Sequence, residues 1–250
     1  MGRIEDSFAR AKAQGRGAFI AYLTMGFPSE ERSVEAAGDL ISQGADIIEL
    51  GVPFSDPFAD GATIRAAAYE ALRRGTSLAG VLRMAARLRA AHPDTGLVLF
   101  SYANPLYSMG LDAFARAAAD AGIDAALAVD VPLEERGELL AALRPHGIGY
   151  IPLVAPDTPP ARIAASVEGL ENSFAYAITV KGITGERAAL PPDLARRLDA
   201  IRAASRLPVA AGFGISTKAQ AEEVCRHADG FIAGSALVKC LAEGRRPCLR

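Results

Sequence analysis

Residues 19–50 read FIAYLTMGFPSEERSVEAAGDLISQGADIIEL, and this stretch contains the unit from which the fold follows. Two short apolar runs, Phe19–Thr24 and Asp46–Leu50, lie on either side of a segment with helical spacing at Ser33–Gln43. Each apolar run is too short for a helix, and near-continuous apolar strands separated by helices are typical of a parallel sheet that helices cover. The stretch therefore predicts a strand, a helix and a second, parallel strand.

The same unit recurs along the chain. Further strands are expected at Leu97–Ser101, Ala125–Val129, Gly149–Val154, Phe174–Thr179, Pro208–Ala211 and Gly230–Ala233. Helical segments lie between the strands, at Ala66–Arg73, Leu78–Ala91, Leu111–Ala121, Glu134–Leu143, Pro160–Glu168, Leu194–Ala204 and Thr217–Arg226. Eight strands alternating with helices predict a (β/α)8 TIM barrel. An extra N-terminal helix, Arg3–Ala13, is expected to cap its floor, and residues 1–250 are expected to form one domain because no linker divides them.

A doubly wound open sheet is the alternative architecture for alternating strands and helices. That fold usually carries a glycine-rich nucleotide loop after its first strand. This chain has Thr24-Met25-Gly26-Phe27-Pro28 at that place, which favours the barrel.

Composition narrows the possible partners. The chain is 50% hydrophobic and 22% charged, enough for a large core, and its formal charge of −2 excludes a diffuse basic field for nucleic acid. No apolar run is long enough for a signal peptide or a membrane span, so a cytoplasmic location without membrane contact is expected. The three cysteines, Cys225, Cys240 and Cys248, lack metal-ligand spacing and are expected to be inert thiols.

The second strand carries the best candidates for chemistry, because TIM-barrel sites lie at the carboxyl ends of the strands. Alternation places Glu49 opposite Ile48 and Leu50, so Glu49 should point into the barrel, where burial raises its pKa and lets it hold a proton near neutral pH. Asp60, in the following loop, can fold back over the same mouth. In the alternative reading, Glu49 pairs with an arginine and Asp60 caps a helix. Asp56 is expected to shape a turn or contact a partner.

Glycine-rich segments follow the last two strands, at Gly212–Ser216 and Gly234–Ala236. This is a recurrent place for a phosphate in TIM barrels, so a phosphorylated substrate is expected. The long loop after the sixth strand, Val180–Pro192, suits a lid that carries Thr184 and Gly185 to the mouth. The same loop holds Lys181, which could instead form a Schiff base in a phosphosugar aldolase. No metal is expected, because the histidines, His92, His146 and His227, fall away from the mouth.

Several segments together resemble the tryptophan synthase alpha subunit family from about Phe8 to Lys239. The longest is Glu49-Leu-Gly-Val-Pro-Phe-Ser-Asp-Pro-Phe-Ala-Asp60-Gly. The others are Thr24–Pro28, Ser101–Pro105, Asp130–Pro132, Gly182–Gly185, Gly212–Ser216 and Gly234–Lys239, in the family's order and spacing.

The resemblance implies a lyase that splits indole-3-glycerol phosphate into indole and glyceraldehyde 3-phosphate, with Glu49 and Asp60 as its catalytic carboxylates. It implies an indole pocket from Tyr22, Phe100, Leu127, Tyr176, Phe213 and Ile232, with Tyr102 near Glu49. It also implies phosphate contacts from Gly185, Gly214, Gly234 and Ser235, and closure of Thr184 over Asp60.

The family's partner is the beta subunit, and the resemblance implies an alpha2-beta2 heterotetramer in which only the beta subunit binds pyridoxal phosphate. Pro53, Asp56 and Asn104-Pro105-Leu106 match regions that face it. A stand-alone lyase that releases free indole is the alternative, and the aldolase using Lys181 a more remote one.

Several positions depart from the family's usual pattern. Ala62 stands where proline normally follows Asp-Gly, Arg65 where glutamine is usual, and Thr179-Val-Lys181 where Ser-Arg is frequent. These departures bear on the stiffness of the Asp60 loop and on closure of the lid, and leave the two carboxylates in place.

Overall fold

The expected strands form one curled, parallel sheet in the computed structural model, which describes residues 2–178, 192–212 and 214–249. The strands are β1 (Ala18–Thr24), β2 (Ile47–Gly51), β3 (Gly96–Ser101), β4 (Ala125–Ala128), β5 (Gly149–Tyr150), β6 (Leu153–Val154), β7 (Ala175–Ile178), β8 (Val209–Gly212) and β9 (Gly230–Ala233). Their order in the sheet is β5-β4-β3-β2-β1-β9-β8-β7-β6. The fold is the predicted TIM barrel, and the open-sheet alternative is excluded.

The closure of the barrel lies between β5 and β6, where the sequence predicts one strand, Gly149–Val154. The structure divides that segment in two, because Pro152 has no N–H to donate to the ladder. Ile151 still donates its N–H to Ala126 on one side (2.9 Å), and the Pro152 carbonyl accepts the Tyr176 N–H on the other (2.9 Å). β5 and β6 are therefore two pieces of one barrel strand, and the chain itself closes the ring.

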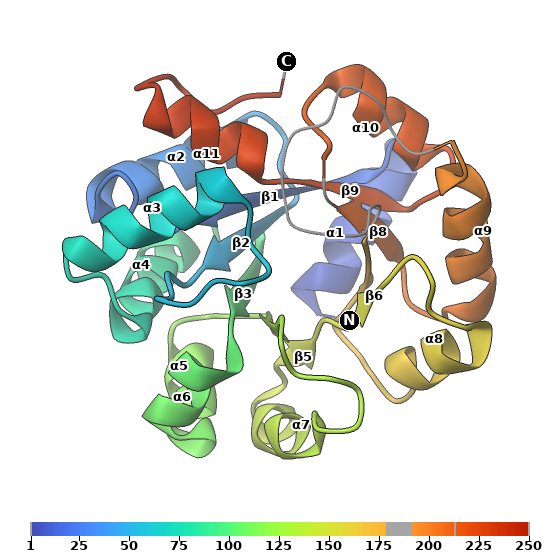
Figure 1. Ribbon diagram of the computed structural model, residues 1–250, viewed down its shortest axis with the longest axis horizontal. Helices are drawn as coiled ribbons and strands as arrows, with labels where there is room; N and C mark the ends of the chain where they lie inside the picture. The colour runs from blue at the N-terminus through green and yellow to red at the C-terminus, as the bar shows by residue number, and fades with distance from the viewer. Residues whose placement is uncertain (1, 179–191, 213, 250) are drawn as a thin grey trace.

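Helices surround the sheet (Figure 1). They are α1 (Arg3–Ala13), α2 (Glu30–Ser42), α3 (Ala62–Arg73), α4 (Leu78–Ala91), α5 (Ala103–Met109), α6 (Leu111–Asp120), α7 (Gly137–Leu143), α8 (Pro160–Val167), α9 (Leu194–Ala204), α10 (Lys218–Cys225) and α11 (Ser235–Ala242), with a 3-10 turn, η1 (Arg144–His146). None of these described helices is long and apolar enough to span a membrane. The predicted bounds of α1, α4 and α9 are confirmed, whereas α2 and α3 begin earlier than expected, and α5 and α11 were not among the predicted helices.

The core around the sheet has an inner and an outer layer, because successive side chains of a strand point to opposite faces of the sheet. Ile48 and Leu50 of β2 belong to an outer cluster that contains residues of α2, α4 and α6. Ile47, on the other face of the same strand, belongs to an inner cluster with Ile20 of β1 and Val98 of β3. Odd and even positions of β2 thus pack on opposite sides of the sheet, and Glu49 lies on the inner side.

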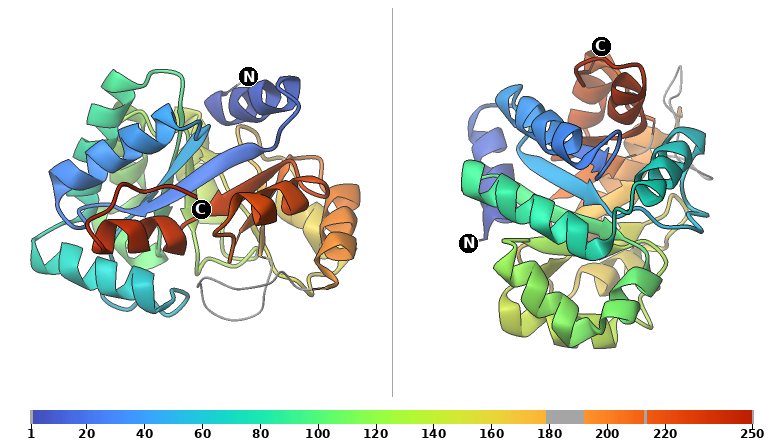
Figure 2. Two further views of the ribbon diagram at one scale, coloured as in Figure 1. Left: turned by 90° about the horizontal axis from the view of Figure 1, so that it is seen from above. Right: turned by 90° about the vertical axis from the view of Figure 1, so that its left-hand side faces the viewer.

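Helix α1 closes the end of the barrel at which the strands begin, as predicted. Ile4, Phe8 and Ala11 are buried in the inner cluster, and the Phe8 ring lies 5.6 Å from that of Phe174. Figure 2 shows α1 at one end of the barrel, apart from the surrounding helices. Ser7 donates a hydrogen bond to the Asp46 carbonyl just before β2 (3.1 Å). This helix supplies the apolar floor beneath the barrel interior.

Three aspartates at this floor repeat one arrangement. Each aspartate directly precedes a strand and pairs with one residue near the start of a neighbouring strand. The aspartate N–H donates to the carbonyl of that residue, and the aspartate carboxylate accepts the N–H of the same residue. The pairs are Asp46 with Phe19, Asp124 with Leu97 and Asp229 with Val209, with carboxylate distances of 2.8 Å in all three. Arginines complete the sites, with Arg16 on Asp46, Arg3 and Arg89 on Asp124, and Arg202 on Asp229. Since a shift by one residue would break both bonds of a pair, these aspartates fix the strand register.

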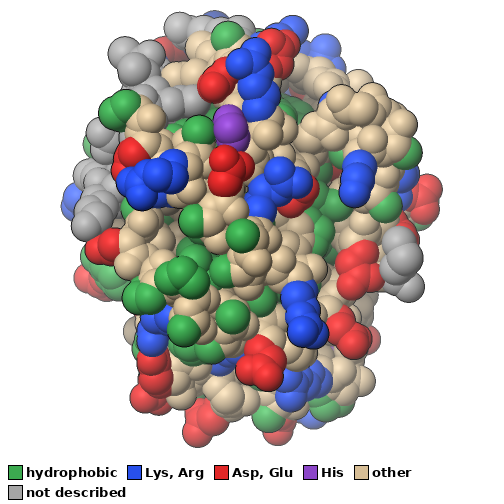
Figure 3. Space-filling view, turned by 90° about the vertical axis from the view of Figure 1, so that its right-hand side faces the viewer, with side chains coloured by type: hydrophobic (Ala, Val, Ile, Leu, Met, Phe, Trp, Pro, Cys, Tyr) green, Lys and Arg blue, Asp and Glu red, His purple; other side chains and the backbone are tan. Residues whose placement is uncertain are grey.

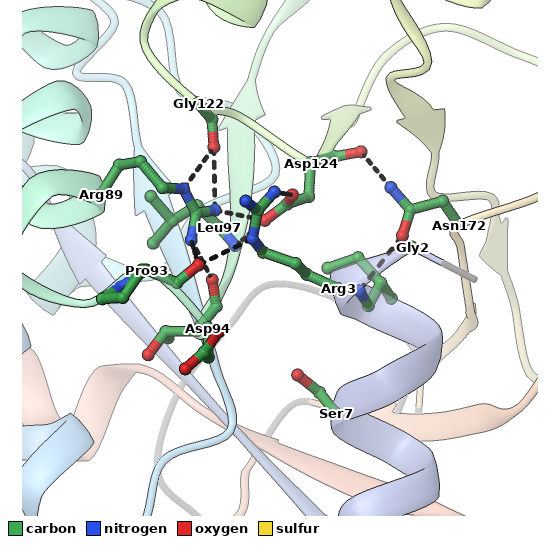
Figure 4. A network of polar contacts seen from close by, with 12 residues as sticks. Gly2, Arg3, Ser7, Arg89, Pro93, Asp94, Leu97, Gly122, Asp124 and Asn172 are labelled. Atoms are coloured by element: carbon green, nitrogen blue, oxygen red, sulfur yellow. Dashed lines mark hydrogen bonds and ion pairs between the residues drawn. The ribbon is translucent and has the colours of Figure 1, made fainter.

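Asp124 holds the densest of these networks (Figure 4). Its side chain is 5% exposed and accepts from Arg89 at 2.5 Å and from Arg3 at 3.1 Å. Arg89 also donates to the carbonyls of Gly122, Pro93 and Thr95. Arg3 belongs to α1 and Arg89 to α4, so one carboxylate ties the floor helix and an outer helix to the sheet.

We predict that Asp124→Ala lowers the free energy of unfolding by about 3 kcal/mol, because it leaves the Leu97 N–H without its acceptor and the Arg89 guanidinium without its carboxylate partner. Urea denaturation measures the change. The control is Glu35→Ala, which removes an exposed ion pair to Arg32 and should leave the transition in place. Equal stability of Asp124→Ala and the wild type would contradict the role of the aspartate.

Candidate active site

Glu49 is a buried acid at the centre of the barrel. Its side chain is 0% exposed and lies in register with Tyr22 of β1 and Val98 of β3. Neither carboxyl oxygen has a hydrogen-bond partner among the described residues, so the alternative pairing with an arginine is not seen there. Burial raises the pKa of Glu49 from 4.5 to about 8. The side chain therefore carries a proton at neutral pH and can donate it.

Asp60 lies in the loop between β2 and α3 and is 5% exposed. Tyr102 donates its hydroxyl to Asp60 Oδ2 at 3.0 Å. Burial raises the pKa of Asp60 to about 6, while this hydrogen bond and the positive charge of Arg65 lower it. The N-cap of α3 is Gly61, without a side-chain hydrogen bond, so Asp60 does not cap this helix. Between about pH 6 and 8 this site holds a protonated Glu49 and an ionised Asp60, two carboxyl groups in different states.

Aromatic and aliphatic side chains line the barrel interior around the two acids. Tyr22, Phe100, Leu127, Tyr176 and Ile232 are buried in the inner cluster, on β1, β3, β4, β7 and β9. The rings of Tyr22 and Phe100 meet edge to face at 5.2 Å. Burial raises the pKa of both Tyr22 and Tyr176, and the negative charges of Asp60 and Glu49 raise it further. The structure thus brings together five of the predicted pocket residues and both acids.

Tyr102 is also at the site, but its observed hydrogen bond is to Asp60, whereas the family resemblance implies a position near Glu49. It follows β3 as the N-cap residue of α5 and is 2% exposed. The hydroxyl also accepts the N–H of Ala59 at 3.1 Å. Proximity of Tyr102 to Glu49 stays a prediction.

Gly51 and Gly212 make room for the tyrosines, a role that the sequence analysis missed. A Cβ added at Gly51 would lie 2.5 Å from Cζ of Tyr22, and one at Gly212 would lie 2.5 Å from the Tyr176 ring. Both glycines end a barrel strand, β2 and β8. A glycine at a strand end that faces an inward tyrosine is the signal that could have located them.

The expected phosphate residues lie at the carboxyl ends of β8 and β9. Gly214 has φ +92°, a conformation that favours glycine, and Gly234 with Ser235 begins α11. The first N–H groups of a helix have no partner inside the helix, so this end of α11 can receive an anion. Four other residues named from the sequence, Thr184, Gly185, Phe213 and Lys181, lie outside the described residues.

Other candidate groups lie apart from this site. The described residues contain no group of three or more His, Cys, Asp or Glu side chains that could hold a metal ion. His227 pairs with Asp199 at the surface, and Cys225, Cys240 and Cys248 are free thiols. The face shown in Figure 3 carries acidic and basic side chains side by side, without a field of one sign. Asp56 is exposed and accepts a hydrogen bond from Ser55 at 2.5 Å, as a turn residue would.

Comparison with known proteins shows the family. The family model described as "Tryptophan synthase alpha chain" matches residues 8–247. The chain belongs to the tryptophan synthase alpha chain family. It is similar to the alpha chain of Laribacter hongkongensis, with 45% identity over 96% of this chain and 90% of that one.

Two solved structures also resemble this member of the family. The alpha chain of Legionella pneumophila superposes with a TM-score of 0.87 and 31% identity, covering 99% of this chain and 92% of that one. The aminoacrylate-bound tryptophan synthase of M. tuberculosis gives a TM-score of 0.87 and 37% identity, over 97% of this chain and 93% of that one. The family makes this chain a lyase of tryptophan biosynthesis and implies a beta-subunit partner.

We predict that Gly51→Ala lowers the free energy of unfolding by about 1 to 3 kcal/mol, because the new methyl group displaces the buried Tyr22 ring. Urea denaturation measures this, with Gly137→Ala as the matched control because a Cβ there meets nothing within 4 Å. The double variant Gly51→Ala with Tyr22→Leu should lose less than the sum of the two single losses. Strict additivity would show that Gly51 and Tyr22 do not compete for space.

Proposed function

We propose that this chain cleaves indole-3-glycerol phosphate to indole and glyceraldehyde 3-phosphate. The observation that carries the proposal is the pair of carboxyl groups, one with a pKa of about 8 and the other of about 6, among aromatic side chains. Such a pair can divide acid and electrostatic roles at neutral pH.

The proposed chemistry needs a proton donor at the indole ring. Glu49 gives its proton to C3 of the ring, which places positive charge on the ring nitrogen. The glycerol hydroxyl next to the ring then loses its proton, its oxygen forms the aldehyde carbonyl, and the electron pair of the broken carbon–carbon bond returns to the ring. The Glu49 carboxylate can accept that proton, so protons balance over the cycle. Ionised Asp60 stabilises the positive ring N–H.

The remaining predicted residues would bind the substrate. Tyr22, Phe100, Leu127, Tyr176 and Ile232 offer an apolar pocket for the flat indole ring, with Phe213 proposed to join them. Gly214, Gly234 and Ser235 would bind the phosphate, together with Gly185 and Thr184 from the lid.

We propose that the partner is the beta subunit, in an alpha2-beta2 heterotetramer, and that pyridoxal phosphate binds only that subunit. Pyridoxal phosphate is held as a Schiff base on a lysine side chain. The described lysines of this chain all lie on helices and none on a barrel strand that leads to the site: Lys12, Lys218 and Lys239. Phe58 and Tyr107 are exposed aromatics beside the partner-facing segments Asp56 and Asn104–Leu106. Exposed aromatic side chains are typical of protein interfaces. A cytoplasmic location stays a prediction.

We predict that Glu49→Gln keeps the fold and loses about 10²-fold or more of the indole-releasing turnover, because the amide keeps the shape of the acid but has no proton to donate. The measurement is indole release from indole-3-glycerol phosphate, with and without a beta subunit. Glu35→Gln serves as a matched control, since Glu35 is an exposed glutamate on α2, paired with Arg32 and outside the pocket.

The outcomes separate the remaining alternatives. Near-normal turnover of folded Glu49→Gln would contradict the proposed acid. Full turnover without the beta subunit, unchanged when it is added, would favour the stand-alone lyase. A borohydride-trapped adduct on Lys181 would favour the Schiff-base aldolase instead.

We predict a bell-shaped pH dependence of kcat/KM. The rate should fall below about pH 6, where Asp60 gains a proton, and above about pH 8, where Glu49 loses the proton that it must donate. Steady-state rates between pH 5 and 9.5 measure both limbs. A rate that still rises above pH 8.5 would contradict Glu49 as the acid.

A further inference from the structure

Phe58 is an exposed aromatic that nevertheless contacts the buried part of the site. Its side chain is 69% exposed, the largest value among the exposed large hydrophobic residues described. Its ring meets the ring of Tyr102 edge to face, with centroids 5.4 Å apart. Tyr102 is 2% exposed and bonded to Asp60. The Tyr102 side chain therefore connects the surface residue Phe58 to Asp60.

The loop of residues 52–61 wraps around Tyr102. Phe54 packs on the Tyr102 ring at 5.1 Å and Phe58 on it at 5.4 Å. The hydroxyl accepts from the Ala59 N–H at 3.1 Å and donates to Asp60 at 3.0 Å. Four residues of one loop thus contact a single side chain, and two of those contacts are ring to ring.

The backbone next to Tyr102 is fixed separately, by the loop after β4. Asp130 accepts the N–H of Ala103 at 2.7 Å, at the first residue of α5. The main chain of Tyr102 is therefore held from one side, while the rings of Phe54 and Phe58 contact its side chain. Movement of Phe58 would remove one of the two described ring contacts on Tyr102 and so weaken the hold on its hydroxyl at Asp60.

We propose that Phe58 is a positioning residue, whose ring holds the Tyr102 hydroxyl on the Asp60 carboxylate from outside the pocket. The kinetic part of this inference rests on the proposed function, because it takes Asp60 as an acid that works ionised. The geometric part, that Phe58 controls the bond between Tyr102 and Asp60, stands without it.

Other charged and titratable groups also act on Asp60. The positive charge of Arg65, on α3, lowers the pKa of Asp60. The charge of Asp60 also contributes to the raised pKa values of Tyr22 on β1 and Tyr176 on β7. The charge of Asp130 contributes to the raised pKa of Tyr102. Among the described ring–ring and cation–π contacts, Phe58 meets Tyr102 and none of these groups, so changing Phe58 tests the ring contact with Tyr102.

The test measures two values in the full chain: the pKa of Asp60, from its titration by carboxyl 13C NMR, and the midpoint pH of the acid limb of kcat/KM. Tyr102→Phe removes the hydroxyl and should raise both by about one pH unit, because a hydrogen bond to an ionised group favours that form. Phe58→Leu keeps an apolar cover but loses the ring edge, and should raise both by roughly half a unit. Phe58→Tyr keeps the ring and should restore the wild-type values.

Tyr69→Ala is the matched control. Tyr69 is also an exposed aromatic, at 65%, but lies on α3 beside Arg73 and should shift neither readout. An unchanged Asp60 titration in Phe58→Leu, or a shift to lower pH, would overturn the proposal. A wild type without lyase activity whose Asp60 titration still responds to Phe58→Leu would overturn the proposed function and leave the positioning role supported.

Discussion

The register of the parallel strands is the constraint on which the rest of the molecule depends. In a strand, a slip of one residue exchanges the inward and outward faces. Asp46, Asp124 and Asp229 prevent such a slip by binding both the N–H and the C=O of one residue on the adjacent strand. With that register, Glu49 lies inside the barrel beside Tyr22; one residue away it would lie among the outer helices.

The two ends of the barrel treat carboxyl groups in opposite ways. At the floor, Asp124 is buried but meets two arginines and a backbone N–H, so its charge is compensated. Within the barrel, Glu49 has no such partner in the described structure. Asp60 is intermediate, with one hydroxyl donor. Stability and reactivity are thus separated along the barrel axis, as is usual for this fold.

Local sequence patterns predicted most of the fold but not the contacts between loops. The alternation of side chains along β2 was sufficient to predict that strand and the inward direction of Glu49, because the two faces of the strand are buried in different layers. The seven-residue helix α5 was missed because Pro105 and its short length hide any period. The bond between Tyr102 and Asp60 joins loops from different strands, so no local pattern records it. The role of Phe58 depends on that bond and could not be predicted either.

The unpaired carboxyl of Glu49 also makes the folding of the barrel depend on pH. Its pKa is 4.5 as an ordinary side chain and about 8 when buried. Between these values the folded chain keeps a proton that the unfolded chain has released, which favours unfolding increasingly as the pH rises. The stabilisation from this group is fully present below pH 4.5 and is lost as the pH rises to about 8. Through Glu49, the barrel therefore loses resistance to unfolding across the range in which this acid is poised to react.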